Sequence, residues 1–240
     1  MNSCHRAKVA FPIRWCRLFL LVHVTLAFCG CARLQQYRLH CTPCPSSQHC
    51  PLDAVEETKD YLLGFIEFDD QGWLWNPNQL QAVMERLQKE ESTNSNGLVI
   101  VLYAHGWKHN VSAADGDVKM FRGILEGMQA MEYDLNPKHP RKVAGVCLGW
   151  RGKSLKTPGI WNLSFWDRKR TANVVGQGAV AEILAGLDRI RLQSRVQHRE
   201  RIARGERLPT MFVVTGHSFG TIVLYSALAS LIQERLINIK

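Results

Sequence analysis

The sequence predicts an α/β domain built on a doubly wound, mostly parallel β-sheet. Residues 98–104 (LVIVLYA) and 208–215 (LPTMFVVT) are short, almost wholly apolar and rich in β-branched side chains. Strands buried on both faces of a parallel sheet have this composition. Segments with helical spacing stand between such runs, and this alternation is typical of a parallel sheet covered by helices. A chain of 240 residues, of which 46% are apolar, is long enough for one sizeable domain.

The domain is expected to span residues 59–240, and its first half contains two strands and one helix. Residues 61–68 (YLLGFIEF) predict a strand that ends at the turn-like sequence DDQG. Residues 78–91 predict a helix, because apolar side chains recur there at helical spacing. Those side chains are Leu80, Val83, Met84 and Leu87. Residues 98–104 form the second, buried strand.

The second half of the domain continues the alternation. Residues 117–133 predict a helix with an apolar stripe of Met120, Phe121, Ile124, Leu125 and Met128. A strand over 143–148 and a long helix over 173–197 follow. The buried strand over 208–215 and a helix over 221–236 end the domain, which we expect to be incomplete at its C-terminus.

The basic charge of the chain is concentrated at its N-terminus. The formal net charge is +9, but residues 1–40 carry six basic side chains and no acidic one. The other 200 residues carry 24 basic and 21 acidic side chains, so we expect no nucleic-acid partner. Four of the basic residues precede the apolar run 18–29, which is short for the roughly 30 Å of a bilayer core. This layout indicates an export signal.

The run ends in LAFCGC, where small residues before a cysteine resemble a bacterial lipoprotein cleavage site. Cys31 fits the lipid-bearing position better than Cys29, although Phe28 departs from the usual aliphatic residue. Residues 1–31 are therefore expected to be a signal peptide of lipoprotein type, with an uncleaved membrane anchor as the alternative. Either places the protein outside the cytoplasm, on the periplasmic side of a bacterial cell envelope, with a membrane surface as partner.

Residues 32–58 are expected to be a linker that contains cysteine and proline. Cys41, Cys44 and Cys50 lie close together there, beside His49. A disulfide in an oxidising compartment and a zinc site are both open interpretations, and the lack of a second Cys-x-x-Cys pair favours the disulfide. Cys147 lies in an apolar run and is expected to be a small buried hydrophobic residue.

The pattern with the most chemical content is Gly216-His217-Ser218-Phe219-Gly220. It matches the G-x-S-x-G nucleophile elbow, and a predicted strand precedes it while a predicted helix follows it, as the motif requires. A sharp turn holds the serine in a strained conformation, and glycines at 216 and 220 remove side chains that would clash. Ser218 is therefore the candidate nucleophile.

A second pattern, Tyr103-Ala104-His105-Gly106-Trp107, follows the buried strand directly. Over residues 60–236 the chain resembles the α/β-hydrolase superfamily, specifically uncharacterised esterase- or lipase-like bacterial members. The resemblance implies an oxyanion hole formed by the backbone N–H of Gly106 or Trp107 and that of Phe219. His105 is expected to brace this loop, and His109 to be a surface residue.

The chain departs from the superfamily after the nucleophile. The family order is nucleophile, acid, histidine, but the 22 residues after Ser218 contain one acid, Glu234, and no histidine. Glu234 would lie roughly 24 Å along the helix from Ser218. We therefore expect a truncated hydrolase, inactive as it stands, that needs no cofactor or metal and whose relatives act on small esters or lipid-like acyl groups. The alternative is a non-catalytic, membrane-anchored lipoprotein that uses the scaffold for binding.

Residues 155–170 (LKTPGIWNLSFWDRKR) form an aromatic stretch between a strand and a helix. Trp161, Phe165 and Trp166 suit a lid over an acyl chain, and ordinary packing at the sheet edge is an equal alternative. Asp167 is expected to pair with Arg168 or Arg170 on the surface.

Overall fold

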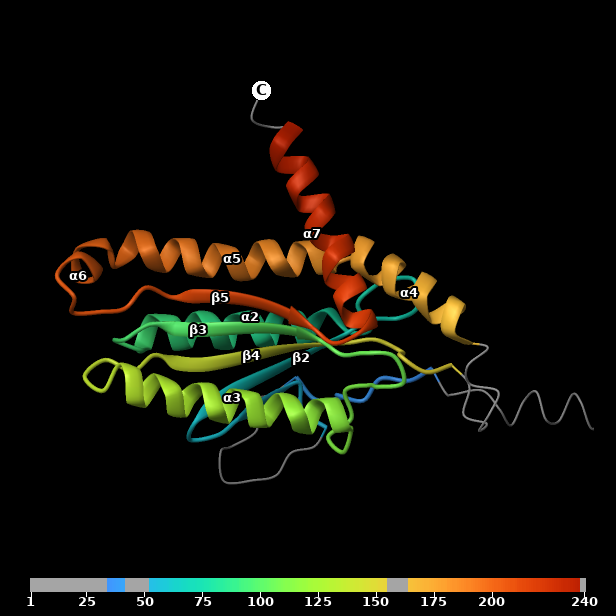
Figure 1. Ribbon diagram of the computed structural model, residues 1–240, viewed down its shortest axis with the longest axis horizontal. Helices are drawn as coiled ribbons and strands as arrows, with labels where there is room; N and C mark the ends of the chain where they lie inside the picture. The colour runs from blue at the N-terminus through green and yellow to red at the C-terminus, as the bar shows by residue number, and fades with distance from the viewer. Residues whose placement is uncertain (1–33, 42–51, 155–163, 238–240) are drawn as a thin grey trace, which may run out of the picture.

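A computed structural model describes residues 34–41, 52–154 and 164–237. The described chain forms a five-stranded sheet with helices on both faces (Figure 1). The strands are β1 Val55–Glu57, β2 Tyr61–Glu67, β3 Leu98–Ala104, β4 Lys142–Gly149 and β5 Met211–Gly216. The helices are α2 Pro77–Thr93, α3 Gly116–Leu135, α4 Phe165–Gln177, α5 Val180–Gln197, α6 Arg199–Ala203 and α7 Phe219–Ile237. None of the described helices is long and apolar enough to cross a bilayer.

The strand order is β1-β2-β4-β3-β5, and all neighbouring pairs are parallel except β1 with β2. The predicted α/β class with a mostly parallel sheet is confirmed. α3 covers one face of the sheet, where Phe121 and Leu125 join the core, and α2, α4, α5 and α7 cover the other. In a parallel sheet the loops that follow the strands meet at one edge, so the segments after β3 and β5 become neighbours.

Two of the predicted helices differ from the observed ones. The predicted helix 173–197 is helical over most of its length, but it is two helices, because α4 begins at Phe165 and a break around Gly178 separates it from α5. Gly178 lies against the backbone of Gly72, where a larger residue would clash, and this contact interrupts the helix. In α3 the predicted apolar stripe is right for Phe121, Leu125 and Met128 but wrong for Met120 and Ile124, which are 45% and 42% exposed. The buried face follows Val118, Phe121 and Leu125.

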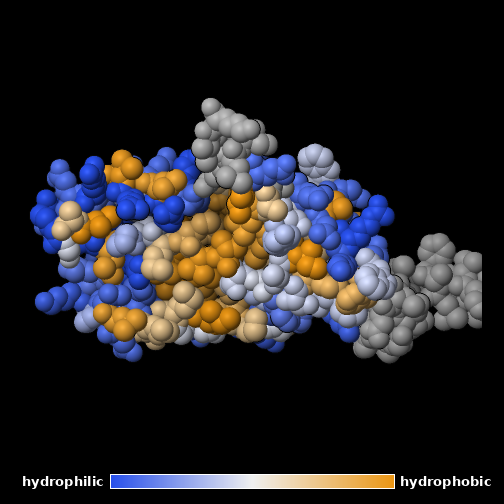
Figure 2. All heavy atoms as spheres, turned by 45° about the horizontal axis from the view of Figure 1, so that its top comes forward, coloured by the Kyte–Doolittle hydropathy of each residue, from blue (hydrophilic) through white to orange (hydrophobic). Residues whose placement is uncertain are grey.

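The prediction that the last strand is buried on both faces is wrong. β5 pairs only with β3 among the described strands, and Met211 is 44% exposed while Phe212, Val213 and Val214 are half-buried. The neighbouring helix α7 also exposes Leu228 and Ile232. Figure 2 shows a broad hydrophobic area in the middle of the face that it presents.

The predicted linker over 32–58 is wrong in part, because Arg38 and residues 53–55 are buried in the domain, whereas Leu34, Leu39 and Leu52 are exposed. β1 lies within this segment, and Arg38 is fully buried. The guanidinium of Arg38 lies 3.6 Å from the centre of the Phe65 ring and 2.6 Å from Glu56 Oε1. Arg38 Nε also donates to the backbone carbonyl of Val111 at 2.8 Å. A buried charge of this kind needs these partners, which lie far away in the sequence.

The remaining expectations for the N-terminal region fall partly outside the described residues. The export signal of residues 1–31 and the cysteines Cys44 and Cys50 belong to the part that is not described. Cys41 is half-buried and forms no disulfide within the described residues. Cys147 is buried in β4 as predicted, and burial raises the pKa of its thiol.

Replacing Arg38 tests whether the segment before β1 belongs to the folded domain. We expect Arg38→Ala to lower the free energy of unfolding by about 3 kcal/mol, as is typical when one member of a buried ion pair is removed. Urea unfolding followed by circular dichroism measures this. Arg204→Ala is the control, because Arg204 pairs with Glu206 at the surface. Equal urea midpoints for the two variants would contradict the packing of this segment.

Candidate functional site

The turn between β5 and α7 places Ser218 at its tip. Ser218 is exposed and has a φ of +52°, in the left-handed region that side chains other than glycine rarely adopt. The flanking glycines allow this turn. A Cβ at Gly216 would lie 2.8 Å from Gly220 C and Thr221 N, and a Cβ at Gly220 would overlap the carbonyl oxygen of Ala104. The turn therefore combines backbone strain with close approach to the end of β3.

The loop after β3 lies directly beside this turn. The His217 N–H donates to the Ala104 carbonyl at 3.0 Å. A Cβ built on Gly106 would lie only 3.2 Å from Ser218 Cβ. The rings of Trp107 and Phe219 are 6.0 Å apart. The structure thus brings together all six residues that the sequence singled out, since Gly216 and Gly220 flank the same serine.

The backbone N–H groups in this region differ in their partners. The Gly106 N–H donates to Asp117 Oδ2 at 3.0 Å, so it is already engaged. Within the described part of the chain, the N–H groups of Trp107 and Phe219 have no acceptor. The resemblance implied an oxyanion donor at either Gly106 or Trp107. Because the Gly106 N–H is engaged, only the Trp107 N–H is available for this role.

His105 braces the loop, as the sequence analysis expected. It is fully buried, its Nε2 accepts from the Trp150 N–H at 3.1 Å, and its ring stacks on the Trp150 ring. Its Nδ1 therefore carries the proton and donates to the Gly106 carbonyl at 3.0 Å. Burial lowers the pKa of His105 to about 4, which keeps the ring neutral. With both nitrogens engaged, it has none left to act as a base.

Asp117, in the first turn of α3, connects the two loops. Its Oδ2 accepts from Tyr103 OH, the Gly106 N–H and His217 Nδ1, each at 3.0 Å. Its Oδ1 lies 3.3 Å from His109 Nε2. Burial acts to raise the pKa of Asp117, but the hydrogen bonds from Gly106 and His217 outweigh it and hold the pKa below its ordinary value. Asp117 is therefore an ionised carboxylate that ties β3, the serine turn and α3 together.

The sequence analysis missed this role of Asp117 and misplaced His109. His109 is not a free surface residue, because it is 30% exposed and its Nδ1 lies 3.0 Å from Asp115 Oδ1. Asp115 is also the N-cap of α3 and accepts from the Asp117 N–H at 2.8 Å. The sequence Asp-Gly-Asp before a helix indicates such a cap. The groups His109, Asp117 and His217 could together hold a metal ion.

Aromatic side chains cover one side of the serine turn. Phe165, at the start of α4, packs against Trp107 and Phe219 with ring centres 5.2 and 5.0 Å away. Trp166 is exposed, and Trp161 lies outside the described residues. Asp167 pairs with Arg168 at 2.6 Å, as predicted, but Arg168 is buried and also pairs with Asp70, so the pair does not lie wholly on the surface. The start of α4 therefore supplies an apolar wall next to the free N–H groups.

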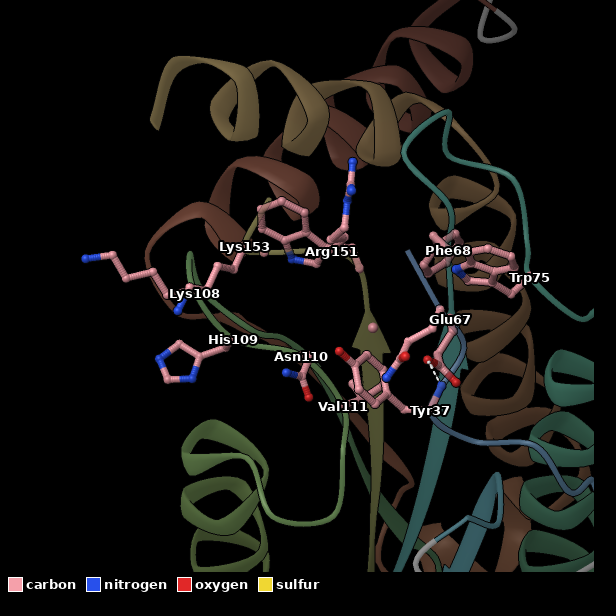
Figure 3. Close-up of a pocket in the computed structure, with 14 residues that line it drawn as sticks. Tyr37, Glu67, Phe68, Trp75, Lys108, His109, Asn110, Val111, Arg151 and Lys153 are labelled. Atoms are coloured by element: carbon pink, nitrogen blue, oxygen red, sulfur yellow. Dashed lines mark hydrogen bonds between the residues drawn. The ribbon is translucent and has the colours of Figure 1, made fainter. Parts of the chain in front are cut away.

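A separate cavity of about 360 Å³ lies on the other side of the loop after β3. Figure 3 shows Glu67 and Tyr37 in its wall, joined by the hydrogen bond from Tyr37 N–H, while Lys108 and His109 point away from Glu67. The Glu67 carboxylate also accepts from the Arg38 N–H and from Gln79 Nε2. None of the described lining residues belongs to the serine turn. The Glu67 carboxylate thus holds the N-terminal segment in place.

Asp117→Asn tests whether the ionised carboxylate stabilises the site. With a chelator present, we expect the variant to lose about 1.5–3 kcal/mol of unfolding free energy at neutral pH, the usual value of hydrogen bonds to a charged group. The native pKa lies below the ordinary value of 3.8, so the advantage of wild type is full above that value. It disappears as the pH falls through the native pKa. Urea unfolding at several pH values measures this, with the exposed Asp134→Asn on the same helix as control. A difference that grows in acid would contradict the assignment.

Comparisons with known proteins do not place this chain in a family. No family model, curated protein or solved structure matches it. The likeness to the α/β-hydrolase superfamily therefore rests on the residues around Ser218 and His105.

Proposed function

We propose that this chain carries the nucleophile and oxyanion hole of a serine hydrolase of the α/β-hydrolase type. The observation that carries the proposal is the conformation of Ser218. This residue is exposed, has a φ of +52°, and lies between a parallel strand and a helix. A nucleophile elbow requires this strand–turn–helix setting. In acyl transfer, Ser218 Oγ would bond to the carbonyl carbon of an ester. The ester C–O bond would then break, so that the alcohol leaves with the proton given up by the hydroxyl and the acyl group stays on Ser218.

The N–H groups of Trp107 and Phe219 are the proposed oxyanion donors. Both lack an acceptor among the described residues, and they come from the loop after β3 and from the residue after the nucleophile, as in the superfamily. Phe219 also begins α7, whose N-terminal dipole favours negative charge. Groups fixed in this way stabilise a tetrahedral intermediate without reorganising.

Among the described residues, no histidine hydrogen-bonds Ser218 Oγ. His105 and His109 have both ring nitrogens engaged. His217 Nδ1 is held by Asp117, but its ring is not in hydrogen-bond contact with the hydroxyl. An unassisted serine hydroxyl is a poor nucleophile. We therefore expect no sustained ester turnover by this chain alone. The lack of a general base within the described chain also favours the second candidate function, a binding protein that retains the scaffold without catalysis.

The surroundings of the turn favour an apolar acyl group as substrate. Phe165, Trp107 and Phe219 place an aromatic wall beside the proposed oxyanion donors. The basic N-terminus followed by an apolar run supports export and attachment to a membrane, where esters and lipid-like acyl groups are accessible.

Covalent labelling distinguishes the hydrolase from the binding scaffold. We expect a fluorophosphonate to modify Ser218 slowly but stoichiometrically, because the N–H groups polarise the reagent while no base assists the hydroxyl. Peptide mass spectrometry of the full chain locates the label. The exposed Ser92 and Ser95 serve as internal controls, and Ser218→Ala should abolish the reaction. Labelling spread evenly over the exposed serines would favour the scaffold. Repeated turnover of an activated ester that requires Ser218 would contradict the expected lack of a base.

A pair of glycine substitutions tests whether the turn itself creates the reactivity. Gly220→Ala should abolish labelling of Ser218, because the added methyl group would overlap the Ala104 carbonyl and push the turn away from β3. Gly123→Ala is the matched control, since nothing lies within 4 Å of a Cβ there. It should keep full labelling and gain about 0.5–1 kcal/mol of stability from its helical position. Undiminished labelling of a folded Gly220→Ala variant would rule out the elbow geometry.

A further inference from the structure

We propose that His109, Asp117 and His217 form an open binding site for a divalent transition-metal ion such as Zn²⁺. Their ligand atoms all lie within 4.8 Å of one another. Two imidazoles and one carboxylate form a ligand set that Zn²⁺ accepts, with a fourth position left for water. The site does not depend on Ser218 being a nucleophile.

The three ligands come from different parts of the fold. His109 lies in the loop after β3, Asp117 in the first turn of α3, and His217 immediately after β5. Asp117 and His217 are 100 residues apart, and the parallel sheet brings them together at the ends of its strands. Because the sheet and α3 fix these positions, the ligands are arranged before any ion binds.

The contacts around the ligands orient them for an ion. Asp115 Oδ1 lies 3.0 Å from His109 Nδ1, which directs His109 Nε2 toward Asp117. A carboxylate that holds the second nitrogen of a ligating histidine is a common feature of metal sites. Tyr103 OH and the Gly106 N–H both donate to Asp117 Oδ2, which leaves Oδ1 available for an ion.

The exposure of the site suits an ion that exchanges with solvent. Asp117 is buried, whereas the side chains of His109 and His217 are 30% and 51% exposed. An ion would therefore have a route to solvent and room for a bound water. His217 precedes Ser218 in the sequence, so the ion would lie close to the serine turn, where a metal can polarise an oxygen or lower the pKa of water.

The competing explanation for the proximity of these three side chains is that hydrogen bonds alone hold them together, with no metal ion. In that case His109 and His217 donate to carboxylates, and the cluster does no more than join the loops. The two explanations differ in whether a metal ion displaces those protons and binds with defined stoichiometry.

Titration of the metal-free full chain with Co²⁺ tests the proposal. We expect one equivalent to bind with the visible absorption of a nitrogen- and oxygen-ligated ion, without the thiolate charge-transfer bands that the N-terminal cysteines would give. Zn²⁺ should displace it and raise the melting temperature. His109→Asn and His217→Asn should lose this binding, while His198→Asn, outside the cluster, should keep it.

Further variants separate ligation from folding and from the proposed hydrolase. Asp115→Asn should fold and bind roughly 10–100-fold more weakly, as expected when a group that orients a ligand is lost. Ser218→Ala should bind like wild type even if no labelling of Ser218 is ever found. Failure of the wild-type protein to bind Co²⁺, or equal nitrogen- and oxygen-type binding by a folded His109→Asn/His217→Asn variant, would overturn the proposal.

Discussion

The site depends on the hydrogen bonds that the carboxylate of Asp117 accepts. It accepts from Tyr103 at the end of β3, from Gly106 in the following loop, and from His217 in the serine turn. Since Asp117 itself belongs to α3, one buried charge joins the sheet, two connecting loops and a helix. An unpaired carboxylate in this position would be costly, so the loops are held together by the need to satisfy it.

This arrangement also decides which backbone groups remain available. Asp117 uses the Gly106 N–H, and the contact of Gly220 with Ala104 sets the distance between the serine turn and β3. The N–H groups of Trp107 and Phe219 are left without an acceptor in the described structure. A free N–H is expected at Phe219, in the first turn of α7, whereas the Trp107 N–H lies in a loop, where donors usually find partners.

Patterns within one segment predicted more of the molecule than did contacts between segments. The apolar runs of β3 and β4 and the glycine-flanked Ser218 have local signatures, and all are found where expected. The fully buried Arg38 and the Asp117–His217 pair depend on partners 18 to 100 residues away, for which a single sequence contains no local pattern. The exposure of β5 likewise follows from which strands pair, and its apolar composition gave no indication of it.

The choice of residue at position 218 is an argument for function. A left-handed conformation costs a serine of order 1–3 kcal/mol, whereas glycine adopts it without penalty. Glycine occupies positions 216 and 220 of the same turn, where side chains would clash, yet the most strained position carries a hydroxyl. That hydroxyl is exposed, so it adds nothing to the core. Stability alone would favour glycine at 218, so the serine found there supports the proposed role of its hydroxyl.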